Sequence, residues 1–188
     1  MYMKATGIVR RIDDLGRVVI PKEIRRTMRI REGDPLEIYT DREGEVIFKK
    51  YSPIGELAGF AAQYAETLHK TCLLAVVICD RDAVIACSGV PRKEFADKAL
   101  SDELEGIING RSLYVFREGE DRLPVLATAG DDHYIGCAMP ILSEGDIIGC
   151  VVSVHSTDEQ KRASAPAADV ETKLIQTAAT FLGKQLES

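Results

Sequence analysis

The sequence predicts two domains of different classes: a small, β-rich module at residues 1–52 and a larger α+β domain with an antiparallel sheet and flanking helices at residues 53–188. Charge separates them, because residues 1–50 carry a net charge of +3 and residues 51–188 carry −9, in a chain whose net charge is −6. The first part consists of short β-branched runs between turns. In the second part, long amphipathic helices alternate with strand patterns.

The first domain begins with two predicted strands, a turn and a short helix. Ile8–Ile12 and Arg17–Ile20 are β-branched runs, and Gly16 between them can adopt the positive φ of a hairpin turn. Pro21 ends the second run and suits the first turn of a helix. The sequence therefore predicts a two-turn helix at Lys22–Arg29.

A second hairpin is expected from Leu36–Thr40 and Val46–Tyr51, which a turn at residues 41–44 connects. A module of about fifty residues with four short strands and one short helix buries too little apolar surface to be stable alone. We therefore expect residues 1–52 to form a homodimer, in which a second chain supplies the missing core.

The segment from Lys4 to Arg31 is strongly basic, with nine cationic and three acidic side chains. Such a segment attracts polyanions, and several Arg side chains together can neutralise the phosphates of a duplex. A basic surface without any partner is the simpler alternative. The density of charge on one side of a turn and a helix, in an otherwise acidic chain, instead favours double-stranded DNA as the partner.

The run TGIVRRIDDLGRVVIPKEIRRTMRIREGDPLEIYTDREGEVIFKKY closely resembles the DNA-binding domain of AbrB-type transition-state regulators. The resemblance implies a swapped-hairpin barrel in which two chains interleave their strands and grip DNA with basic side chains. By this resemblance, the DNA-binding residues are Arg10, Arg11, Arg17, Arg25 and Arg26, with Lys4 and Lys22 as secondary candidates.

The second domain is predicted as helices alternating with strands. Helices are expected at residues 54–70, at residues 95–108 and at Ala167–Leu186. Strands are expected at Leu73–Cys79, Ala83–Cys87, Ser112–Phe116, Leu123–Thr128, Tyr134–Leu142 and Asp146–His155. The turn at residues 143–146 makes the last two strands a hairpin.

The run PILSEGDIIGCVVSVHS is similar to a hairpin of GAF domains, and the order of the two domains resembles the AbrB-type regulators of sporulation that carry a C-terminal GAF domain. The resemblance implies an activator, a repressor or both, assembled as a homotetramer through the second domain. It also implies a possible small-molecule effector of unknown identity. In the GAF pocket region, Arg92, Arg111 and Tyr134 are the candidate ligand-binding residues.

The sequence contains no nucleotide-binding loop and no spacing of ligands typical of a metal site, so we expect no catalytic residue, no metal and no cofactor. His69, His133 and His155 lie far apart in the sequence, and His69 and His155 are expected to be surface or capping residues. The five Cys residues lie mostly in apolar runs, which is typical of buried thiols in a reducing compartment. We expect a soluble cytoplasmic protein, and the resemblance places it on the nucleoid of the forespore.

Two alternatives of other classes remain. One is a GAF-type thiol reductase fused to a DNA-binding module, because such enzymes use Cys residues near the pocket; the position of these Cys residues inside predicted strands argues against it. The other is an AbrB-like antitoxin. Antitoxins usually append a disordered tail that wraps the toxin, whereas this chain appends a folded domain.

Overall fold

The computed structural model describes residues 6–128, 132–158 and 165–187. The chain divides into two compact units, Met1–Tyr51 and Ser52–Ser188. No helix in these described ranges is long and apolar enough to cross a membrane.

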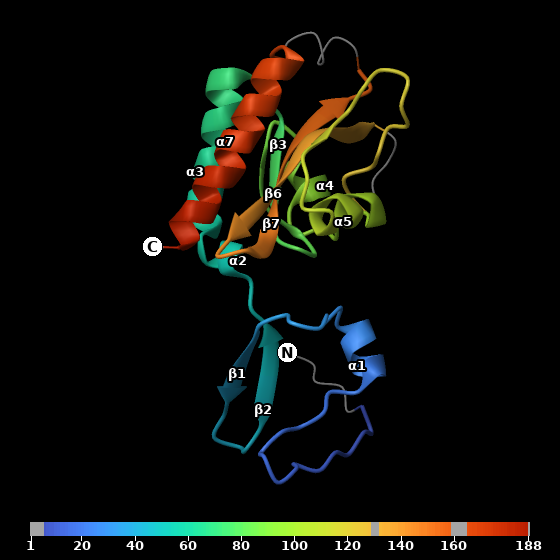
Figure 1. The fold of residues 1–188 in the computed structure, drawn as a ribbon, viewed down its shortest axis with the longest axis vertical. Helices are drawn as coiled ribbons and strands as arrows, with labels where there is room; N and C mark the ends of the chain where they lie inside the picture. Colours follow the sequence, from blue (N-terminus) through green and yellow to red (C-terminus); the bar gives the residue numbers. More distant parts are fainter. Residues whose placement is uncertain (1–5, 129–131, 159–164, 188) are drawn as a thin grey trace. The chain divides into compact units, whose positions relative to one another are not determined.

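The N-terminal unit contains one short helix and one hairpin (Figure 1). Helix α1 spans Lys22–Thr27, and strands β1, Leu36–Thr40, and β2, Val46–Lys50, pair antiparallel. In the turn between the strands, Asp41 Oδ1 accepts the backbone N–H groups of Glu43 and Glu45, each at 2.9 Å. The second hairpin is thus confirmed, and the helix is two residues shorter than predicted.

The two strands predicted before α1 are absent from the described chain, so this prediction is wrong for a single copy. Ile8–Ile12 and Arg17–Ile20 meet at the expected turn, where Asp13 N–H donates to Arg17 O at 3.0 Å and Gly16 N–H donates to Asp13 O at 3.0 Å. A strand needs a neighbouring strand along its length to pair its backbone groups. Residues 6–51 provide none for these two runs.

The C-terminal unit is built on a five-stranded antiparallel sheet with the order β4-β3-β7-β6-β5. The strands are β3 Val76–Cys79, β4 Val84–Ser88, β5 Tyr114–Val115, β6 His133–Ser143 and β7 Asp146–Ser156. The β6–β7 hairpin, predicted from its turn, forms the centre of the sheet. The α+β class with an antiparallel sheet is therefore confirmed.

Helices cover both faces of this sheet (Figure 1). On one face lie α2, Pro53–Glu56, α3, Ala58–Cys72, and α7, Ala168–Leu186, with α3 and α7 side by side. On the other lie α4, Arg92–Phe95, and α5, Asp102–Asn109. Each face has its own core, one around Ile78, Val151 and Ile175, and the other around Val77, Leu104 and Val152. Alternate side chains of one strand thus supply both cores.

The helix predicted at residues 95–108 is two helices, α4 and α5, so its continuity was predicted wrongly. Ser101 is the N-cap of α5, because its Oγ accepts the N–H of Leu104 at 3.1 Å and donates to Pro124 O at 2.6 Å. Just before it, Ala99 and Leu100 form isolated bridges with Ala83 and Leu126. Distant partners therefore hold these residues in an extended conformation, although their apolar spacing fits a helix.

Two smaller corrections concern Leu123–Thr128 and the first helix of this unit. Leu123–Thr128 forms no strand beyond the Leu126 bridge, because its carbonyl groups are used singly: Leu123 O accepts from Ile135 N–H and Val125 O accepts from Ser101 N–H. The helix predicted at residues 54–70 is interrupted at Leu57, the residue that ends α2 and precedes α3.

Helix α7 approaches the β6–β7 hairpin closely enough to require a glycine. A Cβ built on Gly183 would overlap Leu142 O, whereas a Cβ on Gly106, at an exposed position of α5, has no atom within 4 Å. The absence of a side chain at Gly183 thus sets the distance between α7 and the sheet.

We predict opposite effects for the same substitution at these two helical glycines. Gly183→Ala should lower the free energy of unfolding by about 2 kcal/mol, because α7 must shift away from Leu142. Gly106→Ala should raise it by about 0.5–1 kcal/mol through helix propensity alone. Urea denaturation of both variants checks this, and equal effects of the two substitutions would contradict the close approach of α7.

Candidate nucleic-acid interface

The turn before α1 is fixed by a carboxylate that also holds one of the candidate DNA-binding residues. Asp13 Oδ1 accepts the N–H groups of Arg17 at 2.7 Å and Leu15 at 3.1 Å, and Asp13 Oδ2 accepts from Arg17 Nε at 2.8 Å. These bonds, first that from the Arg17 backbone and then that from its side chain, lower the pKa of Asp13. Arg17 is therefore positioned at the turn while its side chain remains 68% exposed.

Helix α1 places two further candidates on its surface. Lys22 and Arg26 are exposed, whereas Arg25 is half-buried and its Nε is buried without a hydrogen-bond partner in the described chain. After the helix, Ile30 N–H donates to Arg25 O at 2.8 Å, and Lys50 Nζ donates to Arg29 O at 2.9 Å. The second of these bonds joins the end of β2 to the chain after α1, so the hairpin and the helix support each other.

The structure leaves most of the predicted DNA-binding side chains accessible. Arg10 and Arg11 are exposed in the segment before the turn, as are Arg17, Lys22 and Arg26 after it. Lys4 lies outside the described residues. An accessible cluster of cations is what a polyanion requires, since each phosphate contact releases condensed counterions.

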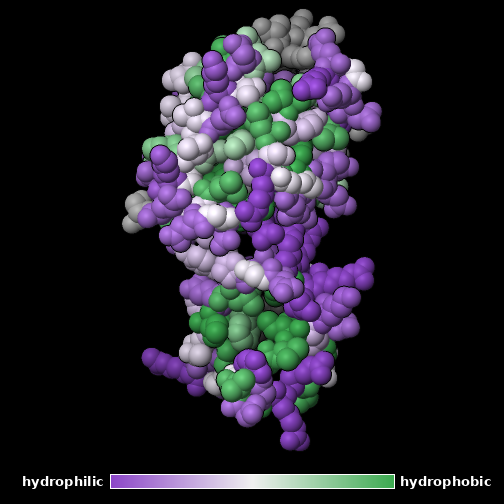
Figure 2. Space-filling model, viewed as in Figure 1, coloured by the Kyte–Doolittle hydropathy of each residue, from purple (hydrophilic) through white to green (hydrophobic). Residues whose placement is uncertain are grey.

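The same unit exposes an unusual amount of apolar surface. Of residues 6–51, Pro21 alone is buried. The exposed large apolar side chains are Ile8, Val9, Ile12, Leu15, Val18, Val19, Met28, Ile38, Tyr39, Val46, Phe48 and Tyr51. Figure 2 shows apolar side chains gathered on this unit. A single copy therefore has almost no core, and contiguous apolar surface of this kind marks an interaction site.

The three candidate ligand-binding residues of the C-terminal unit do not come together. Arg92 is exposed at the start of α4, and Arg111 Nη1 donates to Gly145 O at 2.8 Å on the surface. Tyr134 is buried in β6, with Arg122 over its ring at 5.0 Å and its hydroxyl without a partner in the described chain. None of the three lines either of two cavities found among the described residues.

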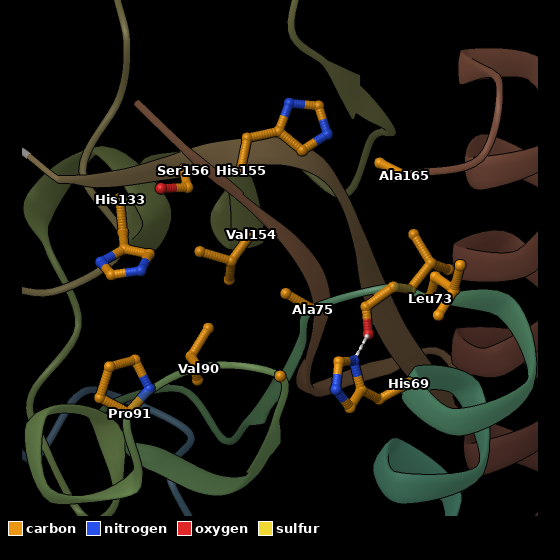
Figure 3. Close-up of a pocket in the computed structure, with 12 residues that line it drawn as sticks. His69, Leu73, Ala75, Val90, Pro91, His133, Val154, His155, Ser156 and Ala165 are labelled. Carbon is orange, nitrogen blue, oxygen red and sulfur yellow. Dashed lines mark hydrogen bonds between the residues drawn. The ribbon is translucent and has the colours of Figure 1, made fainter. Parts of the chain in front are cut away.

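The larger cavity, of about 520 Å³, is lined instead by all three histidines of the chain (Figure 3). This differs from the expectation that His69 and His155 are surface or capping residues. His69 comes from the end of α3, His133 from the start of β6 and His155 from the end of β7. Their wide separation in sequence hid this arrangement, because only the sheet topology brings those three ends together. The described residues contain no group of His, Cys, Asp or Glu able to hold a metal ion.

The cysteine thiols are protected rather than activated. Cys79, Cys137 and Cys150 are buried in the cores, while Cys72 and Cys87 are partly buried. Burial raises the pKa of Cys87, Cys150 and Cys137, the last to about 12. For Cys137 the buried carboxylate of Glu171 adds to this effect. Since the thiolate is the reactive form, these positions are poorly suited to thiol chemistry.

Comparison with known proteins shows similarity along the whole chain. The family model described as stage V sporulation protein T C-terminal, transcription factor, matches residues 56–187, and the model described as antidote-toxin recognition MazE, bacterial antitoxin, matches residues 9–55. Stage V sporulation protein T of Bacillus subtilis (strain 168) is 50% identical over 185 residues, which cover 98% of this chain and 99% of that protein.

The basic unit has further relatives. The transition state regulatory protein AbrB of Bacillus subtilis (strain 168) is 64% identical over 53 residues, which cover 28% of this chain and 54% of that protein. A solution structure of the N-terminal DNA recognition domain of the Bacillus subtilis regulator AbrB shares 63% identity and covers 27% of this chain and 94% of that one, with a TM-score of 0.24. The predicted resemblance of the first quarter of the chain to AbrB-type regulators is thus confirmed at the level of sequence.

We predict that the buried thiols resist alkylation in the folded protein. With a pKa of about 12, only about one Cys137 thiol in ten thousand is ionised at pH 8. Iodoacetamide should therefore modify the partly exposed Cys72 first, and Cys137 and Cys150 only after urea is added. Peptide mapping by mass spectrometry checks the order, and modification of native Cys137 as fast as Cys72 would contradict it.

Proposed function

The chain belongs to the family of stage V sporulation protein T, a family of transcription factors, and we propose that it regulates sporulation genes by binding double-stranded DNA with its N-terminal unit. The observation that supports this most is the accessible cationic surface around the Asp13 turn and α1, in a chain of net charge −6. Cations gathered on one small unit attract DNA although the whole protein is acidic.

Within this proposal, the candidate residues have distinct roles. Arg10 and Arg11 contact phosphates, and so does Arg17, which Asp13 keeps in place until DNA competes for its guanidinium. Helix α1 presents Arg26 to the duplex. Arg25 contacts the duplex beside Arg26, because its planar guanidinium can donate to two acceptors on a guanine edge or a phosphate. Lys22 and Lys4 add charge.

We further propose that two copies of residues 1–52 form a swapped-hairpin dimer. The segments Ile8–Ile12 and Arg17–Ile20 have β-branched sequences but no strand neighbour within residues 6–51, and their large apolar side chains are mostly exposed. Pairing with the same segments of a second copy satisfies both needs at once, since it completes a sheet and buries apolar surface. The dimer also doubles the basic surface, which suits two half-sites on DNA.

The second unit is proposed to join dimers into a tetramer through α3 and α7. Phe60, Tyr64 and Phe181 form an aromatic cluster between these helices, with ring centroids 5.6 to 6.3 Å apart. Phe60 and Phe181 are more than one third exposed, as is Val170 on α7. An aromatic cluster left at the surface of two helices that lie side by side is suited to an interface with a second copy.

We assign the C-terminal unit to the GAF type and propose that it responds to a small effector rather than catalysing a reaction. The raised pKa values of Cys87, Cys137 and Cys150 argue against a thiol reductase. The antitoxin model matches only the DNA-binding part of the chain, whereas the transcription-factor model matches residues 56–187. We therefore favour a cytoplasmic, nucleoid-bound regulator of the forespore over both alternatives.

The DNA proposal is tested with the full chain and a duplex that the wild-type protein selects from genomic fragments. Arg26→Ala and Arg10→Ala should each weaken binding about tenfold and reduce the slope of log affinity against log salt concentration by about 0.9, because one phosphate contact is lost. Both variants should unfold at the wild-type temperature, since both side chains are exposed.

The matched control is Arg42→Ala, which removes the same charge from an exposed position in the β1–β2 turn that is not among the candidate residues. Its affinity and salt slope should remain close to those of the wild type. Fluorescence anisotropy at four salt concentrations measures both quantities. An equal loss of DNA affinity in Arg42→Ala and Arg26→Ala would mean that only the net charge of the protein matters, and it would overturn the assignment of this surface.

A further inference from the structure

The cavity that holds the three histidines forms where β7 extends beyond its neighbour β3. The last backbone bond between these two strands runs from Val154 N–H to Ala75 O, at 2.8 Å, and β7 continues to Ser156 beside β6 only. Before β3, Leu73 has a left-handed conformation, with φ 58°, and turns the chain out of α3. The missing length of β3 leaves a hollow at this corner of the sheet (Figure 3).

One glycine keeps this hollow open. Gly89 has φ +79°, and a Cβ there would lie 2.6 Å from His69 Nδ1 and 2.8 Å from Ala75 Cα. A larger residue at position 89 would thus displace His69 and the start of β3. In Figure 3, Ala75, Val90 and Val154 surround open space, with His133 and His69 on opposite sides of it.

The hydrogen bonds define which nitrogen atoms remain available. His69 Nδ1 lies 3.0 Å from Leu74 O. Because a carbonyl oxygen only accepts hydrogen bonds, Nδ1 carries the proton, and Nε2 has no hydrogen-bond partner in the described chain. His155 Nε2 donates to Glu171 Oε1 at 2.8 Å, and its Nδ1 is buried without a partner in the described chain. His133 meets the ring of Phe95 edge-on, with centroids 5.4 Å apart.

Ionisation of the described lining can give this cavity positive charge only. Its described lining contains no Lys, Arg, Asp or Glu, so the imidazoles are the groups that can ionise there, and they ionise to cations. Glu171, which also accepts from Ser153 Oγ, lies against His155 and offsets its charge. Positive charge on His69 or His133 is therefore not offset by a carboxylate in the described lining of this cavity.

Other charged groups lie near one of these two rings. His133 also lines the second cavity, together with Lys93, Glu94, Lys98 and Asp132, two cations and two anions that offset each other. Apart from Ser156, the other side chains that line the larger cavity are apolar, with Leu73, Val90 and Val154 among them. A volume of about 520 Å³ lies within the range of small-molecule sites.

We propose that this cavity binds a small organic monocarboxylate. Its carboxylate accepts a hydrogen bond from the protonated ring of His133, and its apolar body packs against Val154, Val90 and Leu73, toward His69 on the opposite side of the cavity. The site differs from the three residues favoured by the sequence and does not depend on DNA binding. The proposal thus defines the ligand of the C-terminal unit by its charge and its size.

The test uses the full chain without DNA, and hexanoate and hexanamide as probes of equal shape and different charge. Calorimetry should detect binding of hexanoate at pH 6, with affinity about tenfold weaker at pH 8, because an imidazolium binds a carboxylate more strongly than a neutral imidazole does. Hexanamide should bind at least tenfold more weakly at pH 6 and with no pH dependence. Equal affinities of the two probes, or no binding of hexanoate at millimolar concentration, would overturn the proposal.

A pair of isosteric variants locates the site. Val90→Asp places a negative charge in the wall of the cavity, and Val90→Asn places a neutral group of the same shape there. Hexanoate should bind Val90→Asp at least tenfold more weakly than Val90→Asn at pH 6, while both variants keep the wild-type circular dichroism spectrum. His133→Gln should also reduce the affinity about tenfold. Equal binding by both Val90 variants would exclude this cavity as the carboxylate site.

Discussion

The absence of a core in the N-terminal unit determines how the rest of the protein must be organised. Among residues 6–51 only Pro21 is buried, while Val9, Ile12 and Val19 are each more than two thirds exposed. Burial of apolar surface is the main source of folding free energy, so one copy of this unit has little of it. A second copy is the simplest source, and in the dimer that we propose it would also pair the two runs before α1 that have no strand neighbour within residues 6–51.

The C-terminal unit, in contrast, has two well-packed cores of its own. Its central hairpin β6–β7 separates two cores, and α7 is held against the sheet by the close approach at Gly183 and by the bonds of Glu171 to Ser153 and His155. A unit packed in this way can carry both the interface proposed on α3 and α7 and the cavity beside His69, near the C-terminal end of α3. In the assembly that we propose, this scaffold would keep a second copy of the basic unit at high local concentration.

The sequence predicted those elements whose signals are local. The hairpins β1–β2 and β6–β7 follow from turns rich in Gly and Asp between alternating strands, and α7 follows from its apolar stripe. Interactions between distant residues accounted for the failures. The break at Ser101 depends on Pro124 O, and the gathering of His69, His133 and His155 depends on where β3 begins relative to β7. The basic residues were found because their charges, unlike their contacts, are visible in the sequence.

The most direct test of this account asks whether the exposed apolar side chains before α1 contact a second copy. Full-length protein labelled with ¹³C at methyl groups is unfolded together with unlabelled protein, refolded as a mixture, and examined by isotope-filtered NOE spectroscopy. We expect intermolecular NOEs to the methyl groups of Val9, Ile12 and Val19, and none to those of Val77 in the core of the C-terminal unit. A spectrum in which Val9, Ile12 and Val19 show only intramolecular NOEs would contradict it.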